Sequence, residues 1–149
     1  MRDVRPAAVA GTFYPGNAAE LAVAVRECLA GTAAPVAPAA SPKALIVPHA
    51  GYVYSGPIAA GAYARLASLR STIRRVVILG PTHRVAVRGL ALPSARAFAT
   101  PLGEVEVDRV AVATLAGLRQ VVVSDSAHAL EHSLEVQLPF LQSVLDDFR

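Results

Sequence analysis

Two histidines follow apolar runs of similar design. Residues 44–49 read ALIVPH, so His49 comes directly after an apolar run and a proline. Residues 76–83 read VVILGPTH and repeat this order, with His83 three residues after residue 80. Two neutral imidazoles that converge could bind zinc, copper or iron, with a carboxylate or thiolate as third ligand. They could equally supply a general acid and a general base.

The apolar runs predict the elements that would position these histidines. Short, branched apolar segments at 43–48 and 74–80 are typical of strands covered on both faces. Between them, residues 56–70 carry an apolar stripe at helical spacing. In open α/β sheets, ligands bind beyond the carboxyl ends of the strands. We therefore expect His49 and His83 to lie at one rim of a sheet.

A second polar group lies in the stretch HALEHSLEVQ, residues 128–137. His132 and Glu135 would share a face of a helix, because they are three residues apart. Both are candidates for catalytic residues, although the same pattern also fits an ordinary helix start. The sequence leaves open which of His128, His132 and Glu135 enters a cleft. Further cleft candidates are Tyr14, Tyr52, Thr82 and His128.

The order of strands and helices predicts an α/β fold in one domain, residues 1–149. We expect an open, mixed, mainly parallel sheet with helices on both faces, because strand–helix–strand units have right-handed crossovers. Pro139 predicts a kink or a broken first turn in the last helix. The further expected elements are helices at 17–31, 108–118 and 131–148, strands at 87–94, 98–107 and 119–125, and a Pro/Ala surface loop at 31–42.

Composition argues against several classes of partner. The net charge of +3 comes with an arginine cluster at 70–75 that no aromatic residues interrupt, so we expect no nucleic-acid binding. No apolar run approaches the roughly 20 residues that span a bilayer, so we expect no membrane insertion. The single cysteine, Cys28, excludes an internal disulfide and favours a cytoplasmic location. Cys28 lies on the apolar face of the helix expected at 17–31, so we expect it to pack in the core.

Several blocks together resemble the Memo family. They read VPHAGYVYSGPIAAGAY at 47–63, ILGPTHR at 78–84 and EHSLEVQLPFL at 131–141. The sequence resembles the bacterial and archaeal members of this family too, which are of the AmmeMemoRadiSam system protein B type. It implies a fold similar to class III extradiol dioxygenases, with a metal-binding cleft at the sheet rim. It also implies that His49 and His83 are metal ligands, and iron or copper is the metal that this pair fits.

The resemblance further implies that this sequence corresponds to the N-terminal half of the family domain. The remaining site residues of the family, a Ser-Asp-x-x-His block and a late Cys, would lie beyond Arg149. We therefore expect an incomplete metal site. We also expect an exposed sheet edge that favours self-association.

Two functions of different classes follow from the resemblance. One is a metal-dependent redox enzyme with dioxygenase-like chemistry. The alternative is a non-catalytic metal- or peptide-binding protein that acts within a complex, since bacterial members are associated with a radical-SAM protein. A small-molecule ligand is compatible with either function. A third interpretation is that the chain is inactive on its own.

Overall fold

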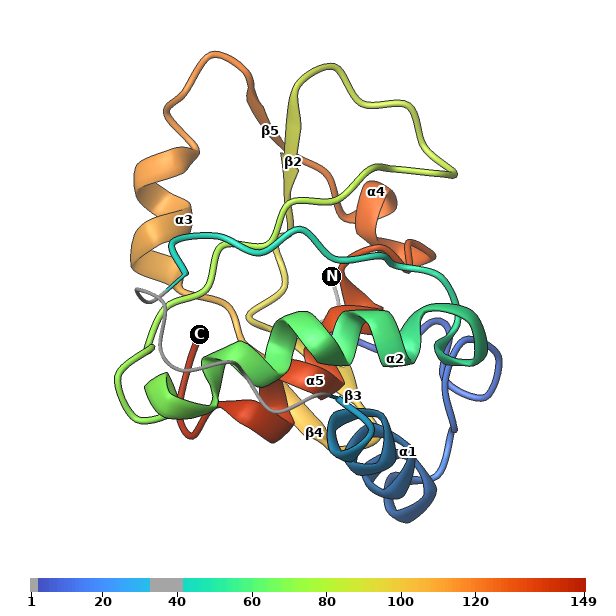
Figure 1. Ribbon diagram of the computed structural model, residues 1–149. Helices are drawn as coiled ribbons and strands as arrows, with labels where there is room; N and C mark the ends of the chain where they lie inside the picture. The colour runs from blue at the N-terminus through green and yellow to red at the C-terminus, as the bar shows by residue number, and fades with distance from the viewer. Residues whose placement is uncertain (1–2, 33–41) are drawn as a thin grey trace.

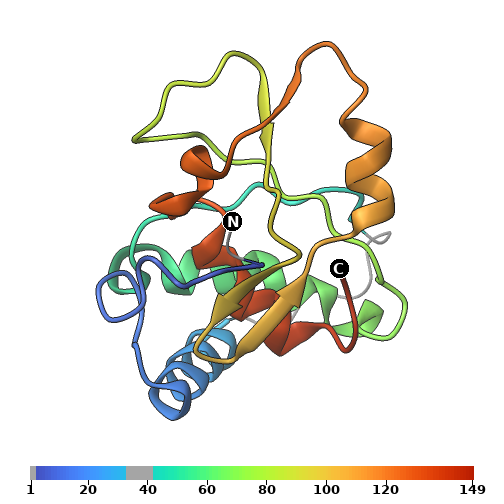
Figure 2. The same cartoon turned by 180° about the vertical axis from the view of Figure 1, so that it is seen from behind.

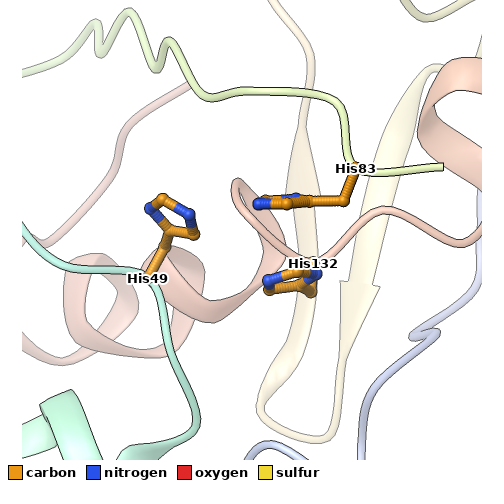
Figure 3. Close-up of side chains that lie close together, drawn as sticks. All are labelled: His49, His83 and His132. Carbon is orange, nitrogen blue, oxygen red and sulfur yellow. The ribbon is translucent and has the colours of Figure 1, made fainter. Parts of the chain in front are cut away.

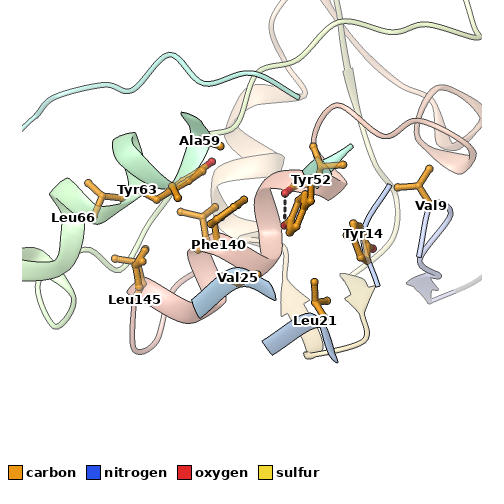
Figure 4. Close-up of a cluster of buried hydrophobic side chains, with 14 residues drawn as sticks. Val9, Tyr14, Leu21, Val25, Tyr52, Ala59, Tyr63, Leu66, Phe140 and Leu145 are labelled. Atoms are coloured by element: carbon orange, nitrogen blue, oxygen red, sulfur yellow. Dashed lines mark hydrogen bonds between the residues drawn. The ribbon is translucent and has the colours of Figure 1, made fainter. Parts of the chain in front are cut away.

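Three helices pack against one another in the lower half of the view in Figure 1. They are α1 (Ala18–Ala30), α2 (Tyr52–Tyr63) and α5 (Leu138–Val144) in a computed structural model that describes residues 3–32 and 42–149. Their shared apolar core also includes residues from the N-terminal segment, and Figure 4 shows how these side chains gather between the helices. Its buried members are Val9, Tyr14, Leu21, Val25, Tyr52, Ala59, Ala60, Tyr63, Leu66, Val136, Phe140, Leu141, Val144 and Leu145.

The first helix confirms the prediction for residues 17–31. The Asn17 side chain caps α1 by accepting the backbone N–H groups of Ala19 and Glu20, and Gly31 closes its C-terminal end. Cys28 is half-buried and packs against the core, as expected. The second helix begins at Tyr52, four residues before the expected start, and continues as the 3-10 helix η1 (Ala64–Leu69).

The strands form two small sheets rather than one open sheet (Figure 2). In the larger sheet, β1 (Val4–Arg5) runs parallel to β3 (Ala97–Thr100), which pairs antiparallel with β4 (Gly103–Glu106). The other sheet pairs β2 (Leu90–Leu92) parallel with β5 (Val121–Val123). The described residues are thus mixed α/β, but the single, mainly parallel sheet that we expected is not formed.

Three of the expected strand regions do contain strands. The regions 87–94 and 119–125 contain β2 and β5, and 98–107 contains most of a hairpin, β3 and β4. The helix expected at 108–118 is α3 (Arg109–Leu115), whose N-terminus is capped by the Asp108 carboxylate. The Pro/Ala loop expected at 31–42 lies almost wholly outside the described residues. None of the helices that are described is long and apolar enough to cross a bilayer.

The two apolar segments that precede the histidines are not strands, so this part of the prediction was wrong. Residues 43–48 and 74–80 form no ladder with any described strand. Ile46 is fully exposed, and Val77 and Leu79 are about three-quarters exposed (75% and 76%). An apolar run indicates that a segment is suited to burial, but a strand also needs a neighbouring strand; among the described residues, 43–48 has none, and 74–80 pairs only with the single residue Arg149.

The last helix is broken, as Pro139 predicted, and its first part is not helical. Residues 131–134 form a turn, followed by the 3-10 helix η2 (Glu135–Gln137) and then α5, in which Pro139 occupies the first turn. Proline has no N–H to donate to the carbonyl four residues before it and its ring crowds that carbonyl, so the regular α-helix begins only at this point. The expectation that His132 and Glu135 share a helical face is therefore wrong.

Candidate metal centre

Three of the four histidines in the sequence converge on one point (Figure 3). His49, His83 and His132 each offer a ring nitrogen, and these nitrogens all lie within 4.8 Å of one another. The ring centroids are 5.3 Å apart between His49 and His83 and 4.5 Å apart between His83 and His132. The structure thus brings together two residues expected as metal ligands and one expected as a catalytic residue.

The start of α2 positions His49. Gly51 is the N-cap of this helix, and the next residue, Tyr52, donates its backbone N–H to the Phe13 carbonyl at 2.7 Å. A Cβ atom on Gly51 would lie 3.4 Å from that same carbonyl oxygen, an ordinary van der Waals contact. The Ser55 hydroxyl donates to the Ala50 carbonyl at 2.8 Å. These contacts attach the segment around His49 to the helix and to the N-terminal loop.

A close contact between two chain segments positions His83. The Ser133 hydroxyl donates to the Pro81 carbonyl at 2.9 Å. A Cβ atom on Gly80 would lie only 2.7 Å from the Ser133 Oγ and 3.0 Å from a methyl carbon of Leu134, so a larger residue would not fit there. The glycine therefore lets residues 80–83 lie against the turn that carries His132.

The Glu131 carboxylate shapes the turn at 131–134. It accepts the backbone N–H groups of His132 and Ser133 at 2.8 and 2.9 Å. The His132 ring packs against Phe13, with a centroid separation of 4.4 Å. His132 is 17% exposed, so one face of its ring lies against protein while the other faces the remaining imidazoles.

Glu131 also holds the ring of His83. Its carboxylate accepts the backbone N–H of His83 at 2.6 Å and lies 2.9 Å from the ring Nδ1. When Nδ1 carries the proton and donates to this carboxylate, Nε2 is the nitrogen left with a lone pair for a ligand. Burial would raise the pKa of Glu131, but the N–H groups of His83, Ser133 and His132 and the His83 ring outweigh it and lower the pKa to about 2. The carboxylate is therefore ionised at neutral pH.

Electrostatics favour the neutral form of His132, which is the form that binds metals. Burial lowers the pKa of His132, and the neighbouring His83, His49 and Arg84 lower this pKa further against the opposing effect of Glu131. Neutral imidazole nitrogens suit zinc, copper and iron. His83 is 40% exposed, so the cluster is open to solvent on one side. The arrangement can hold a cation through three nitrogens and leave room for another ligand.

Glu135 lies in a different network from the imidazoles. Its side chain is fully buried and is ion-paired with Arg5. The same carboxylate accepts the backbone N–H groups of Ala8 and Val9 at 2.9 and 3.0 Å, and also the hydroxyl of Tyr14. With these donors around it, Glu135 anchors the N-terminal segment to η2.

The other cleft candidates lie outside the imidazole cluster. Tyr14 and Tyr52 are buried in the apolar core, and burial raises the pKa of both hydroxyls. Thr82 is exposed in the loop that leads to His83. His128 belongs to α4 (Asp125–Ala129), where its Nε2 lies 3.1 Å from the Ala91 carbonyl oxygen. Burial lowers the pKa of His128.

Sequence reasoning missed three residues that support the site. Glu131 adjoins His132 and was read as part of a helix start, whereas it contacts two of the three histidines. Phe13 contacts the His132 ring and the Arg5 guanidinium donates to the Glu131 carbonyl, each across more than a hundred residues of sequence. An acidic residue next to a histidine is a local signal that could have indicated Glu131. No local pattern could have indicated Phe13 or Arg5, because their partners are distant in the sequence.

Comparison of this sequence with known proteins identifies the family to which the chain belongs. The family described as Memo-like protein matches residues 5–149. The chain belongs to this family. A MEMO1 family protein from Ignicoccus hospitalis is 45% identical over 97% of this chain and 53% of its own length. MEMO1 family proteins from Methanothermobacter thermautotrophicus and Aquifex aeolicus are 39% and 41% identical, over 98% and 93% of this chain.

The Memo-like chain spans about half the length of these curated relatives. The match covers 54% of the Methanothermobacter protein and 49% of the Aquifex protein. All three clustered histidines lie within the matched residues 5–149. The imidazole cluster is therefore part of the region that this chain shares with the family.

Proposed function

We propose that this Memo-like chain binds a redox-active transition metal, iron or copper, through His49, His83 and His132. The observation that carries the proposal is the convergence of three ring nitrogens within 4.8 Å. Metal–imidazole bonds of about 2.0–2.1 Å require small movements of the rings toward a common centre. His83 lies in an exposed loop, which can accommodate such a movement.

The surroundings of the three rings support a metal site. The Glu131 carboxylate contacts the ring Nδ1 of His83 and accepts the backbone N–H of His132. A carboxylate that contacts the second ring nitrogen is usual for metal-binding histidines. Phe13 covers the buried side of His132. The exposed face of His83 leaves a path for a metal and for a small molecule.

We further propose metal-dependent oxidation of a small molecule by dioxygen, which accepts the electrons, as the chemistry of the site. A bound iron or copper ion would supply a centre that exchanges electrons with the molecule beside it. The chain itself contributes three imidazole nitrogens, one open side and an ionised carboxylate that fixes ring orientation. The dioxygenase-like part of the proposal depends on the family resemblance alone.

Metal content of the purified protein tests the proposal. After anaerobic loading with Fe(II), or loading with Cu(II), and gel filtration, we expect about one ion per chain. The double variant His49→Ala/His83→Ala should retain less than a tenth of that amount. His128→Gln is the matched control, since His128 is the one histidine outside the cluster. Equal metal retention by the double variant and the control would refute the site.

The alternative is a non-catalytic metal- or peptide-binding protein. Oxygen uptake with catechol-type substrates that requires His49 and His83 supports the enzyme, whereas peptide binding that survives metal removal supports the alternative. A radical-SAM partner and a cytoplasmic location also remain proposals. The single cysteine is consistent with a reducing compartment.

A further inference from the structure

Acidic residues are absent from a long stretch of the sequence that carries two of the clustered histidines. None of the 11 Asp and Glu residues lies between positions 28 and 103, whereas eight of the 14 Lys and Arg residues do. His49 and His83 both belong to this stretch. A surface lined by charge of one sign creates a potential that concentrates small ions of the opposite sign. The segments that present these two imidazoles therefore favour anions.

Arg84 is the charged residue next to the open side of the cluster. It follows His83 in the chain and is exposed, and the chain bends at residues 83–85. The charge of Arg84 is close enough to the cluster to lower the pKa of His132. Among the described residues, no carboxylate forms an ion pair with Arg84. Its guanidinium is therefore available to an anion from solution.

The carboxylate in contact with the imidazoles does not offset this charge at the opening. Within residues 3–32 and 42–149, Glu131 alone makes such a contact, with His83 and His132. Its side chain is only 5% exposed, and its two oxygens accept the backbone N–H groups of His83, His132 and Ser133. The dipoles of these N–H groups offset part of its negative charge. An entering molecule thus meets an exposed guanidinium, while the carboxylate is buried.

We propose that the open side of the imidazole cluster selects small molecules that carry a carboxylate, with Arg84 as the residue that binds this group. This role of Arg84 rests on the proposed metal-dependent oxidation, whose substrate class it specifies. A planar guanidinium donates two parallel N–H groups to the two oxygens of a carboxylate, and such charge-assisted pairs are stronger than neutral hydrogen bonds. The other end of the molecule then lies toward the metal-binding nitrogens, so Arg84 sets its orientation.

Molecules of other charge fit the opening less well. A cationic molecule would be repelled by Arg84 and by a metal ion bound to the three imidazoles. A neutral molecule would replace the hydration of an exposed guanidinium with an uncharged hydrogen bond, which is weaker than a charge-assisted one. Arg84 supplies one positive charge, which matches a single carboxylate. The expected substrates are therefore small monocarboxylic acids.

Two nitroxides of the same shape test the attraction of anions without any metal. 3-Carboxy-PROXYL is an anion and 3-carbamoyl-PROXYL is neutral, and each broadens the NMR signals of amide protons near which it collects. We expect the anion to broaden the amides of His83, Arg84 and His132 about threefold more than the neutral probe, as a local potential of about one kT predicts. Arg84→Gln should at least halve this ratio. Arg26→Gln removes the same charge from an exposed residue of α1 and should leave the ratio unchanged.

A matched pair of metal ligands tests whether Arg84 selects the molecule that reaches the metal. Pyridine-4-carboxylate and pyridine-4-carboxamide both bind Cu(II) through the ring nitrogen, and they differ in charge at the opposite end. Absorption titrations of the Cu(II)-loaded chain give the two dissociation constants. We expect Arg84→Gln to lower the preference for the carboxylate by about fivefold, the effect of one charge-assisted pair at an exposed site. Arg26→Gln should leave this preference unchanged.

Two results would overturn the proposal. One is a preference for the anionic probe, in either measurement, that Arg84→Gln leaves unchanged. The other is an equal fall of this preference in Arg84→Gln and Arg26→Gln, which would reflect net charge rather than a binding residue. A chain that retains no Cu(II) would instead contradict the proposed metal centre, and the nitroxide ratio would then decide alone whether Arg84 binds anions.

Discussion

The Glu131 carboxylate contacts His83 at two points, the backbone N–H at 2.6 Å and the ring Nδ1 at 2.9 Å. It also accepts the N–H of His132 at 2.8 Å. A single side chain thus links two segments, residues 80–83 and 131–134, that are about fifty residues apart. The relative position of two of the three imidazoles therefore depends on one buried carboxylate.

Replacing this carboxylate should weaken metal binding. We expect Glu131→Gln to lower Cu(II) affinity by about 10–100-fold, because removal of a carboxylate behind metal-binding histidines has effects of this size. A competition titration with a chelator of known affinity measures the change. Glu106→Gln, at an exposed residue away from the cluster, is the control. Affinity within twofold of the control would contradict the assigned role of Glu131.

The same carboxylate should make folding stability depend on acid pH. The pKa of Glu131 is about 2 in the folded chain against an ordinary 4.5, so its contribution is fully present above pH 4.5 and is lost as pH falls toward 2. The contribution is about 2 kcal/mol once solvent access beside His83 is taken into account. Urea unfolding of the metal-free protein at several pH values measures it. Glu131→Gln should show a flatter acid limb, and an unchanged limb would contradict the pKa shift.

A methyl group at position 80 should separate the two segments. Gly80→Ala places a Cβ 2.7 Å from the Ser133 Oγ, so residues 80–83 must move away from the turn that carries His132. We expect a loss of about 1–3 kcal/mol in the free energy of unfolding and a clear fall in metal affinity. Gly61→Ala is the control, because nothing lies within 4 Å of its Cβ and alanine favours the helix. Equal behaviour of the two variants would show that the close approach at Gly80 is unimportant.

Glu135 should matter for stability and not for metal binding. Glu135→Gln leaves the Arg5 guanidinium buried without its anionic partner, which typically costs about 3–5 kcal/mol. Thermal unfolding measures this loss, and chelator competition at a temperature where the variant is folded should give an unchanged affinity. A variant with normal stability and abolished metal binding or turnover would instead support a catalytic role for Glu135.

The sequence predicted local elements well where the signal was local. Asn17 and Gly31 bracket α1, Asp108 caps α3, and Pro139 breaks the last helix. The apolar segment 74–80 was taken for a buried strand because its side chains favour burial. Pairing depends on a distant partner, and among residues 3–32 and 42–149 only Arg149 pairs with the start of this segment.

The site, too, was predictable only where a local sequence pattern indicated it. The repeated order of apolar run, proline and histidine indicated His49 and His83, which do lie together. The sequence left open which of His128, His132 and Glu135 enters a cleft, because that choice depends on the turn that Glu131 stabilises. That turn replaces the expected helix, so periodicity placed Glu135 beside His132 when it faces Arg5 instead.

A count of the imidazoles around a bound ion is the most direct test of a site formed by His49, His83 and His132. Pulsed electron paramagnetic resonance of the Cu(II)-loaded chain reports the number of coordinated imidazoles through their remote nitrogens. We expect three in the unsubstituted protein and in His128→Gln, and two in His132→Ala. An unchanged count in His132→Ala, or a single imidazole in the unsubstituted protein, would contradict it.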